Sequence, residues 1–395
     1  MKVLIYLEED KIAPVGGPLG VGYHMYQTIR DNSIDYIEFL PGNSKQKERE
    51  AKQKAWLYKS KLLTKIVRSV RHIIEYRNMF DNPVDNSNLF AKYDIVHFHR
   101  TSDMYKQRKS LAHFKGKVII TSHSPIPLAQ ELYAAAVTNI ERRFMKKKWE
   151  KFEEMDAWSF LNADYIVFPC EDAEEPYYLN WKYYKTIHEK KKNNYRYIPT
   201  GISNISPSKD RTAIRKQYNI PQEQFLVVYA GRHNEVKGYD SLKSIGSCFL
   251  NQEENSSFLI AGTEGPLKRL EHERWIEAGW TREVHAIINA GDVFILPNKY
   301  TYFDLIMLEV LALGKIVIAS RTGGNKYFEK AKVKGVFLYD TEDQAIELLH
   351  QIKNLSKEKK IELEKSNREY FEEHLTAEKY VNTYVEMIQT IMVGT

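Results

Sequence analysis

The sequence predicts an α/β protein built from two doubly wound, parallel-sheet domains. Short, continuously apolar runs recur along the chain, and such runs are typical of parallel strands that are buried on both faces. Helical stretches separate these runs, as expected where each strand crosses over to the next through a helix. The pattern starts again after residue 201, and 395 residues exceed the ~100 to 200 residues of one ordinary domain core.

The first predicted domain covers residues 1–200. Its opening run, residues 1–7, is followed by a loop that contains Gly16 and Gly17 and by a helix around residues 23–30. Three later runs share the buried-strand pattern, and these are Tyr93–His99, Lys117–His123 and Asp164–Pro169. Ligands of doubly wound sheets bind beyond the carboxyl ends of the strands, so the loops there are the expected place for functional residues.

The second predicted domain covers residues 201–375 and begins with a polar stretch from Ser203 to Lys209. Its strand-like runs are residues 225–231, 257–262, 292–297 and 315–320. From residue 356 onward the pattern is helical, and the apolar residues of the last segment lie on one helical face. We therefore expect residues 376–395 to form a C-terminal helix that packs back on the N-terminal domain.

Composition limits the class of protein. With 43% hydrophobic and 28% charged residues, and with 17 Phe, 26 Tyr and 6 Trp, the chain can bury a core and is not disordered. The opening apolar run turns acidic at Glu8, and nowhere do ~18 apolar residues run together, so we expect neither a secretory leader nor a membrane span. Cys170 and Cys248 can form neither a disulfide framework nor a four-ligand zinc site. A cytoplasmic location is the expectation.

The positive charge of the chain is concentrated in residues 45–77. This segment holds eleven Lys and Arg against three Glu, a surplus of eight charges, whereas the whole chain carries +6, so the remainder is net −2. Apolar residues such as Leu63, Ile66 and Val70 recur at helical spacing between the cations. Either the segment is a helix packed on the first sheet with a solvated basic face, or its cations attach the protein peripherally to the anionic inner face of the membrane, or both. No nucleic-acid motif accompanies the charge, so no nucleic-acid partner is expected.

Residues suited to binding a diphosphate follow the strand-like run 225–231. Gly231 and Gly238 let the backbone approach a ligand closely, Arg232 offers a forked donor, and Lys237 supplies a point charge. Solvated surface charges at a helix start are the simpler interpretation of Arg232 and Lys237. Their position after a strand favours the diphosphate.

A second motif occupies residues 297–320 and includes Phe303, Asp304, Glu309 and Gly314. Together with the diphosphate motif, the Ala261–Pro266 turn and Thr322–Gly324, it resembles the retaining glycosyltransferases of family 4, in order and spacing, over nearly the whole chain. The resemblance implies the GT-B fold, in which two Rossmann-like domains face a central cleft. It also implies a nucleotide-sugar donor, a glycan or lipid-linked glycan acceptor, and a role in the synthesis of cell-surface polysaccharides or glycoconjugates.

The resemblance assigns roles to particular residues. Arg232 and Lys237 would stabilise the departing nucleotide diphosphate, and His123 would lie near the primary hydroxyl of the sugar. Glu309 would bind the ribose, which suits a carboxylate that can accept two hydroxyl protons, although a salt-bridged structural Glu is the alternative. The other donor-binding candidates are Gly16, Gly17, Gly231, Thr301, Phe303, Asp304 and Leu305. His123 can equally be a structural residue at a strand end, and His99 is a candidate on the acceptor side.

The sequence departs from the family pattern at the sugar. The Glu-x₇-Glu motif of the family would place its first Glu at Thr301, and the glycine after its Phe is Asp304 here. The carboxylate that faces the sugar is therefore missing or moved, and the hydroxyl of Thr301 or the carboxylate of Asp304 is its candidate replacement.

These residues predict a retaining hexosyltransferase-type enzyme that uses no cofactor. There is no Walker A motif and no Asp-x-Asp pair to hold a catalytic metal, so Arg232 and Lys237 are expected to neutralise the diphosphate directly. Two alternatives remain open. One is a catalytically silent GT-B subunit that binds a partner transferase or a glycan, as Thr301 suggests, and the other is a nucleotide-sugar epimerase.

Overall fold

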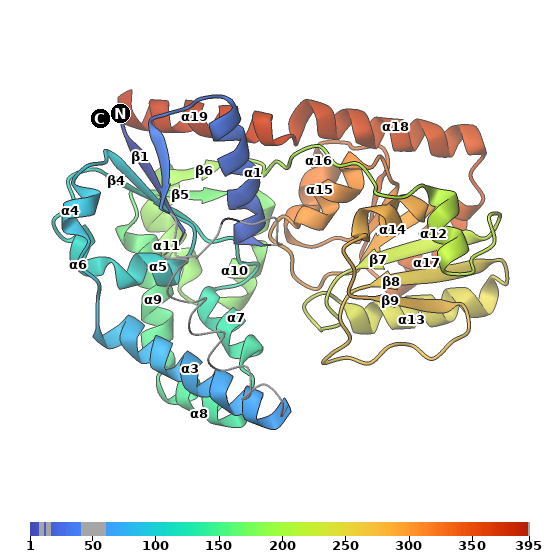
Figure 1. Ribbon diagram of the computed structural model, residues 1–395, viewed down its shortest axis with the longest axis horizontal. Coiled ribbons are helices and arrows are strands. Elements are labelled where there is room, and N and C mark those ends of the chain that lie inside the picture. Colours follow the sequence, from blue (N-terminus) through green and yellow to red (C-terminus); the bar gives the residue numbers. More distant parts are fainter. Residues whose placement is uncertain (8–11, 13–16, 41–60, 394–395) are drawn as a thin grey trace. The chain divides into compact units, whose positions relative to one another are not determined.

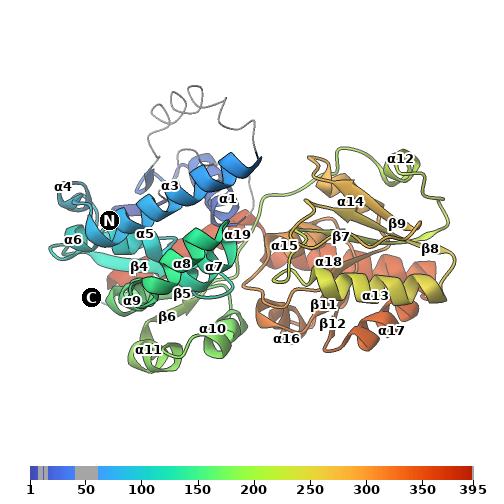
Figure 2. The same cartoon turned by 90° about the horizontal axis from the view of Figure 1, so that it is seen from below.

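A computed structural model describes residues 1–7, 12, 17–40 and 61–393. The chain divides into two compact units. Unit 1 comprises Met1–Phe168 and Tyr177–Ile198, and unit 2 comprises Pro169–Pro176 and Pro199–Thr395. Each unit contains one six-stranded parallel sheet with helices packed around it (Figures 1 and 2). The predicted fold class, two doubly wound Rossmann-like domains, is confirmed.

The sheet of unit 1 has the strand order β2-β1-β3-β4-β5-β6, with all neighbours parallel. The strands are β1 (Val3–Tyr6), β2 (Ile37–Leu40), β3 (Ile95–Phe98), β4 (Lys117–Thr121), β5 (Tyr165–Phe168) and β6 (Tyr195–Tyr197). Every residue of β1 and β3 is buried, in accord with their unbroken apolar sequences. The edge strands β2 and β6 are partly exposed, and neither was among the predicted strands.

Ten helices surround or extend this sheet in the part of the chain that the structure describes. They are α1 (Pro18–Asp31), α3 (Lys61–Asp81), α4 (Ser87–Phe90), α5 (Thr101–Lys106), α6 (Arg108–Leu111), α7 (Leu128–Ala135), α8 (Asn139–Lys147), α9 (Trp149–Asn162), α10 (Glu175–Asn180) and α11 (Tyr184–Lys191). The segment containing α3, α8 and α9 has its own aromatic core, in which the rings of Phe80 and Phe152 meet edge to face at 4.8 Å.

The structure bears on one of the alternatives left open for the basic segment. Leu63, Ile66 and Val70 of α3 do not pack on the first sheet, because their side chains are exposed. The helix is instead held by Tyr76 and Phe80, which are buried among residues of α5, α8 and α9. Residues 45–60 of the basic segment lie outside the described residues.

The sheet of unit 2 has the order β12-β11-β10-β7-β8-β9. Its strands are β7 (Phe225–Ala230), β8 (Ser256–Ala261), β9 (Trp275–Gly279), β10 (Val293–Leu296), β11 (Val317–Ser320) and β12 (Val336–Tyr339). The four predicted strands are confirmed as β7, β8, β10 and β11. The remaining two, β9 and β12, are edge strands with partly exposed residues, which interrupt the apolar pattern.

The helices of unit 2 are those that follow β6 along the chain. They are α12 (Arg211–Gln217), α13 (Tyr239–Gln252), α14 (Val284–Ala290), α15 (Leu305–Ala312), α16 (Lys326–Lys330), α17 (Glu342–Lys353), α18 (Lys357–His374) and α19 (Ala377–Val393). The core buries β7, β8 and β10 against α13 and α17 through Val227, Ile260, Ile295, Leu242 and Leu349. The C-terminal helix predicted for residues 376–395 is α19, and its packing on the N-terminal domain stays a prediction.

Among the described residues, no helix combines the length and the hydropathy that a membrane span requires.

Candidate active site

The predicted site residues of unit 2 gather where the strand order reverses. The chain runs from β7 outward to β8 and β9, then returns to β10 on the other side of β7. The loops that leave the carboxyl ends of β7 and β10 flank this switch point, where α/β sheets bind ligands. Arg232 and Lys237 lie on the first loop, and Thr301 and Asp304 lie on the second.

Glycines allow these loops to approach one another backbone to backbone. Gly238 has φ +62°, and a Cβ atom at this position would lie 1.7 Å from the carbonyl oxygen of Pro297. Gly323, with φ +44°, would place a Cβ atom 2.1 Å from the carbonyl oxygen of Thr301. Both positions exclude a side chain on steric grounds. The glycines therefore fix the loops after β7, β10 and β11 as one assembly.

Lys237 and Asp304 form an ion pair within this assembly. The ammonium of Lys237 lies 2.5 Å from Oδ2 of Asp304, and the amide of Asn298 donates to the same oxygen. Both members of the ion pair are partly buried. By contrast, Arg232 is exposed, and among the described residues its guanidinium has no carboxylate partner. The loop therefore presents one free cation and one neutralised cation.

Glu309 lies on α15 and pairs with a residue that the sequence did not reveal. Its Oε2 is 3.3 Å from Nε2 of His285 on α14. The carboxylate of Glu309 is 24% exposed, whereas its neighbours Leu308 and Val310 are fully buried. A partly exposed carboxylate keeps its charge at modest cost and can accept further hydrogen bonds.

Thr301 is fully buried, and its hydroxyl has no hydrogen-bond partner among the described residues. The same is true of Oδ1 of Asn298, on the same loop. Buried polar atoms are nearly always paired, so unpaired ones at a strand's carboxyl end call for an external partner such as water or a ligand. In the part of the chain that the structure describes, the loop after β10 thus holds two unpaired buried polar atoms.

The three further candidates for donor binding in unit 2 are Phe303, Gly231 and Leu305. Phe303 is buried and packs against Tyr327 and Phe328 of α16 at ring distances of 5.4 and 5.3 Å. Gly231 follows β7, where a Cβ atom would lie 2.5 Å from the hydroxyl of Tyr229. Leu305 is the first residue of α15 and is partly exposed.

His233 and Glu277 were missed by the sequence analysis. His233 follows Arg232, is fully buried, and stacks on Tyr239 at 3.8 Å. Its Nε2 is 3.7 Å from Oε2 of Glu277, and burial lowers the pKa of its imidazole. The polar pair lies beside the predicted diphosphate loop. The one feature of the sequence that could have indicated this pair is the position of His233 next to Arg232.

Unit 1 brings two of its candidates together. Nδ1 of His99 and Nε2 of His123 lie 2.6 Å apart, and the two rings are nearly parallel. His123 is the second residue after β4 and has φ +53°, an unusual conformation for a residue with a side chain. Burial lowers the pKa of His99 to about 3 and that of His123 well below its ordinary value, so both rings are neutral at pH 7.

The glycine pair at the start of α1 is described only in part. Gly17 is the N-cap residue of α1, has φ +77°, and has open space where a Cβ atom would lie. Gly16 lies outside the described residues. Gly17, His99 and His123 belong to unit 1, whereas the other described candidates belong to unit 2.

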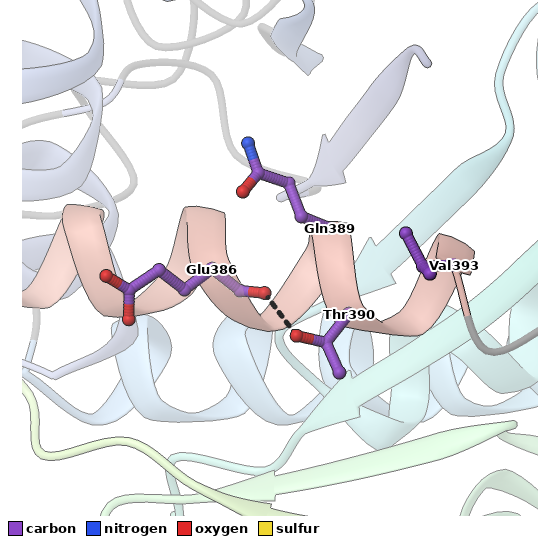
Figure 3. Close-up of a pocket in the computed structure, with 4 residues that line it drawn as sticks. All are labelled: Glu386, Gln389, Thr390 and Val393. Atoms are coloured by element: carbon purple, nitrogen blue, oxygen red, sulfur yellow. Dashed lines mark hydrogen bonds between the residues drawn. The ribbon is translucent and has the colours of Figure 1, made fainter.

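The remaining features offer little chemistry. A surface pocket of about 470 Å³ is lined by Glu386, Gln389, Thr390 and Val393 of α19 (Figure 3). Thr390 donates its hydroxyl to the carbonyl of Glu386 at 2.8 Å, and no cation lines the pocket. In the described part of the chain, no group of three His, Cys, Asp or Glu side chains is arranged to hold a metal ion.

Comparison with known proteins bears on the same unit. Residues 224–358 match the family model of glycosyl transferases, group 1. An uncharacterized glycosyltransferase of Methanocaldococcus jannaschii is 22% identical over 148 residues, which are 35% of this chain and 37% of the relative. Glycogen synthase 2 of Nitrosococcus oceani is 27% identical over 125 residues, 29% of this chain and 26% of the relative. The matches therefore span well under half of these relatives.

Solved structures agree over the whole chain. Sucrose-phosphate synthase from Thermosynechococcus elongatus is similar with a TM-score of 0.65, at 15% identity and with 100% of both chains covered. Anabaena HepE, solved in complex with UDP-glucose, has a TM-score of 0.63 at 13% identity, with 99% of this chain and 100% of that chain covered. The fold is GT-B. Together with the family match, this supports a glycosyltransferase family for the protein.

Proposed function

We propose that the protein is a retaining glycosyltransferase, similar to family 4, that transfers a hexose from a nucleotide diphosphate donor to a glycan or lipid-linked glycan. The observation that carries the proposal is the placement of Arg232 and Lys237 after β7, and of Asp304 and Glu309 after β10, on the two sides of the switch point in the region that matches the group 1 family. The UDP-glucose complex of the structurally similar HepE supports a nucleotide-sugar donor.

The two cations act on the diphosphate as it departs. Arg232 is free to bind a phosphate oxygen, and Lys237 exchanges its bond with Asp304 for one with the diphosphate. Negative charge grows on the leaving group when the bond between the sugar and the phosphate breaks, so these contacts strengthen in the transition state. The acceptor oxygen then bonds to the anomeric carbon on the face that the diphosphate leaves. Its proton passes to the leaving phosphate.

The remaining residues orient the donor. Glu309 accepts the ribose hydroxyls with the acceptor capacity left beside its contact with His285. The buried hydroxyl of Thr301 contacts the sugar in place of the missing family carboxylate. In unit 1, His123 contacts the primary hydroxyl of the sugar, Gly16 and Gly17 bind phosphate, and His99 lies on the acceptor side.

We further propose that transfer needs neither a metal ion nor a cofactor. The basis is the pair Arg232 and Lys237 together with the absence of an Asp-x-Asp sequence. Transfer should continue in excess EDTA, and complete loss that Mg²⁺ or Mn²⁺ restores would overturn this part of the proposal. The proposed setting is synthesis of cell-surface polysaccharide or glycoconjugate on the cytoplasmic side of an anionic membrane.

The decisive experiment measures acceptor-dependent release of nucleotide from UDP- and GDP-sugars, with the configuration of the product determined by NMR. Arg232→Ala and Lys237→Ala should each lose at least about 100-fold in turnover, as expected when one charge-stabilising group is removed. Lys299→Ala is the matched control, because Lys299 lies on the neighbouring loop but pairs with Asp240 at 2.5 Å. Normal turnover in either site variant would remove that residue from the site.

The same assay separates the two alternatives. A catalytically silent subunit, suggested by Thr301 in place of the family carboxylate, would bind nucleotide without releasing it from any donor. An epimerase would convert the donor sugar without an acceptor. Release that depends on the acceptor, with retained configuration in the product, supports the transferase.

A further inference from the structure

The outer face of α3 carries a stripe of exposed apolar side chains. Its members are between 37% and 53% exposed, and these are Leu63, Ile66, Val67, Val70 and Ile74. Their spacing of three and four residues places them on one helical face. Contiguous exposed aliphatic side chains of this kind mark a surface that contacts a protein or a membrane.

The orientation of this apolar stripe is fixed by buried polar contacts on the other side of α3. Glu141 of α8 is fully buried and accepts a hydrogen bond from the hydroxyl of Ser69 at 3.1 Å. Its other oxygen lies 2.7 Å from Nδ1 of His72 and accepts a hydrogen bond from Tyr76 at 3.4 Å. Rolling α3 to hide the stripe would break these contacts and leave the buried carboxylate with the backbone N–H of Val137 alone, which is costly. The stripe therefore faces outward in the folded unit.

Basic residues of two helices border the stripe. On α3, Arg68 and Arg71 are exposed beside the stripe, and the exposed Glu75 pairs with Arg71 at 2.8 Å. The neighbouring α8, seen beside α3 in Figure 1, exposes four cations, which are Arg142, Arg143, Lys146 and Lys147. Its only acidic residue is the buried Glu141.

The outer faces of α3 and α8 meet at Arg77. Arg77 follows Ile74 by three residues on the striped face of α3, and its guanidinium lies 5.6 Å from the centre of the Phe144 ring of α8. Ile140, one helical turn before Phe144, is 65% exposed. Apolar side chains and cations thus share one surface across both helices.

We propose that this α3–α8 surface docks the protein on an anionic lipid bilayer, with the stripe and Ile140 entering the headgroup region and the cations contacting lipid phosphates. An amphipathic helix with aliphatic residues on one face and Lys and Arg beside them is the type that lies in the plane of the interface. Each cation near an anionic surface adds to the attraction. The proposal concerns unit 1 alone and does not depend on the transfer reaction.

Charge favours the bilayer over a second copy of the chain. A symmetric contact through this surface would place the cations of α3 and α8 opposite the same cations of the other copy. Like charges across an interface oppose association, whereas anionic lipid headgroups complement them. The experiment below keeps self-association as an outcome that would overturn the proposal.

The test is sedimentation of the full chain with vesicles of phosphatidylglycerol and phosphatidylcholine, compared with pure phosphatidylcholine. We expect binding to the anionic vesicles only, weakened by salt. The stripe variant Val70→Gln with Ile74→Gln should bind at least about tenfold more weakly, because two aliphatic side chains no longer leave water. Ile361→Gln on α18 is the control, since Ile361 is 53% exposed, like Ile74, but lies in unit 2.

Insertion of the stripe into the headgroup region is measured separately from the electrostatic attraction to the vesicle surface. Val70→Cys and Ile361→Cys, each in a Cys248→Ser background that leaves only the buried Cys170, carry an environment-sensitive fluorophore. A blue shift with anionic vesicles at position 70 and not at 361 supports the proposal. No binding to anionic vesicles at low salt, binding unchanged in the stripe variant, or wild-type self-association that the stripe variant abolishes would each overturn it.

Discussion

The ammonium of Lys237 lies 2.5 Å from the carboxylate of Asp304, so the cation expected to hold the donor diphosphate is already neutralised within the protein. Asp304 stands where the family that this sequence resembles has glycine, which has no side chain to form this bond. The bond joins the loops after β7 and β10 at the switch point of the sheet. In the proposed enzyme, the donor must therefore compete with Asp304 for Lys237.

Removing this competition should tighten nucleotide binding. Asp304→Asn keeps the size of the side chain and removes its charge, so we expect the Kd of UDP or GDP, whichever binds, to fall by about threefold to tenfold, equivalent to roughly 1 kcal/mol. Isothermal titration calorimetry checks the value. Asp240→Asn, which frees Lys299 from an ion pair of the same length, is the control and should leave the affinity unchanged. Weaker binding in Asp304→Asn would mean that Asp304 itself contacts the donor.

Thr301 gives a prediction in which stability and activity move in opposite directions. Thr301→Val keeps the shape and deletes a buried hydroxyl that has no partner among the described residues, so the free energy of unfolding should rise by about 1 kcal/mol. If the hydroxyl contacts the donor sugar, turnover should fall about tenfold while nucleoside diphosphate affinity stays the same. Denaturant unfolding and steady-state kinetics measure the two effects. A loss of stability with normal turnover would make Thr301 structural.

Glu309 can be tested with ligands that differ only in the ribose. Glu309→Gln should weaken nucleoside diphosphate binding about tenfold, because the neutral amide replaces a charged acceptor of the hydroxyl protons. Binding of inorganic diphosphate should not change. Glu329→Gln removes an equal charge from α16, where Glu329 pairs with Arg321, and serves as the control. Equal losses for the two ligands would indicate a general electrostatic effect.

The sequence predicted the interior of both sheets better than their edges. Strands β1, β7 and β10 are buried throughout and appear as unbroken apolar runs, whereas β9 is buried at Trp275 and partly exposed along the rest of its length. Because an edge strand is partly exposed, its sequence contains polar residues, and the unbroken apolar run that indicates a buried strand is lost.

The sequence was less informative about which face of a helix is buried and about which residues pair with the site residues. The stripe of α3 has the same spacing whether it faces a core or solvent, and only Glu141, far along the chain, decides between the two. The site residues Lys237, Asp304 and Glu309 were found from their motifs. Their partners were not, because the Lys237–Asp304 bond depends on how two loops meet, and His285 lies on a separate helix.

The buried histidines of unit 1 predict a dependence of stability on pH. Burial is the main cause of the lowered pKa of His97, His99 and His123, and His99 titrates at about 3. In the unfolded chain these groups titrate near ~6.5. Below that pH the unfolded state binds protons that the folded state does not, so the free energy of unfolding decreases as the pH is lowered. Each histidine contributes up to ~1.4 kcal/mol per pH unit until its folded pKa is reached.

Asp156 should change the free energy of unfolding with pH in the direction opposite to that of the histidines. Comparing a variant of each kind gives the sharpest test. Burial raises the pKa of its carboxyl to about 7, against the opposing effect of hydrogen bonds from Thr101 at 2.5 Å and the backbone of Ala129 at 2.9 Å. Between its unfolded pKa near ~3.9 and pH 7, the folded state holds a proton that the unfolded state has lost, which adds stability as the pH falls. Urea unfolding at pH 5, 6 and 7 should therefore show a shallower loss of stability in His99→Gln and a steeper loss in Asp156→Asn than in the wild type. If both variants keep the wild-type slope, neither group changes its protonation on unfolding, and burial does not control their titration.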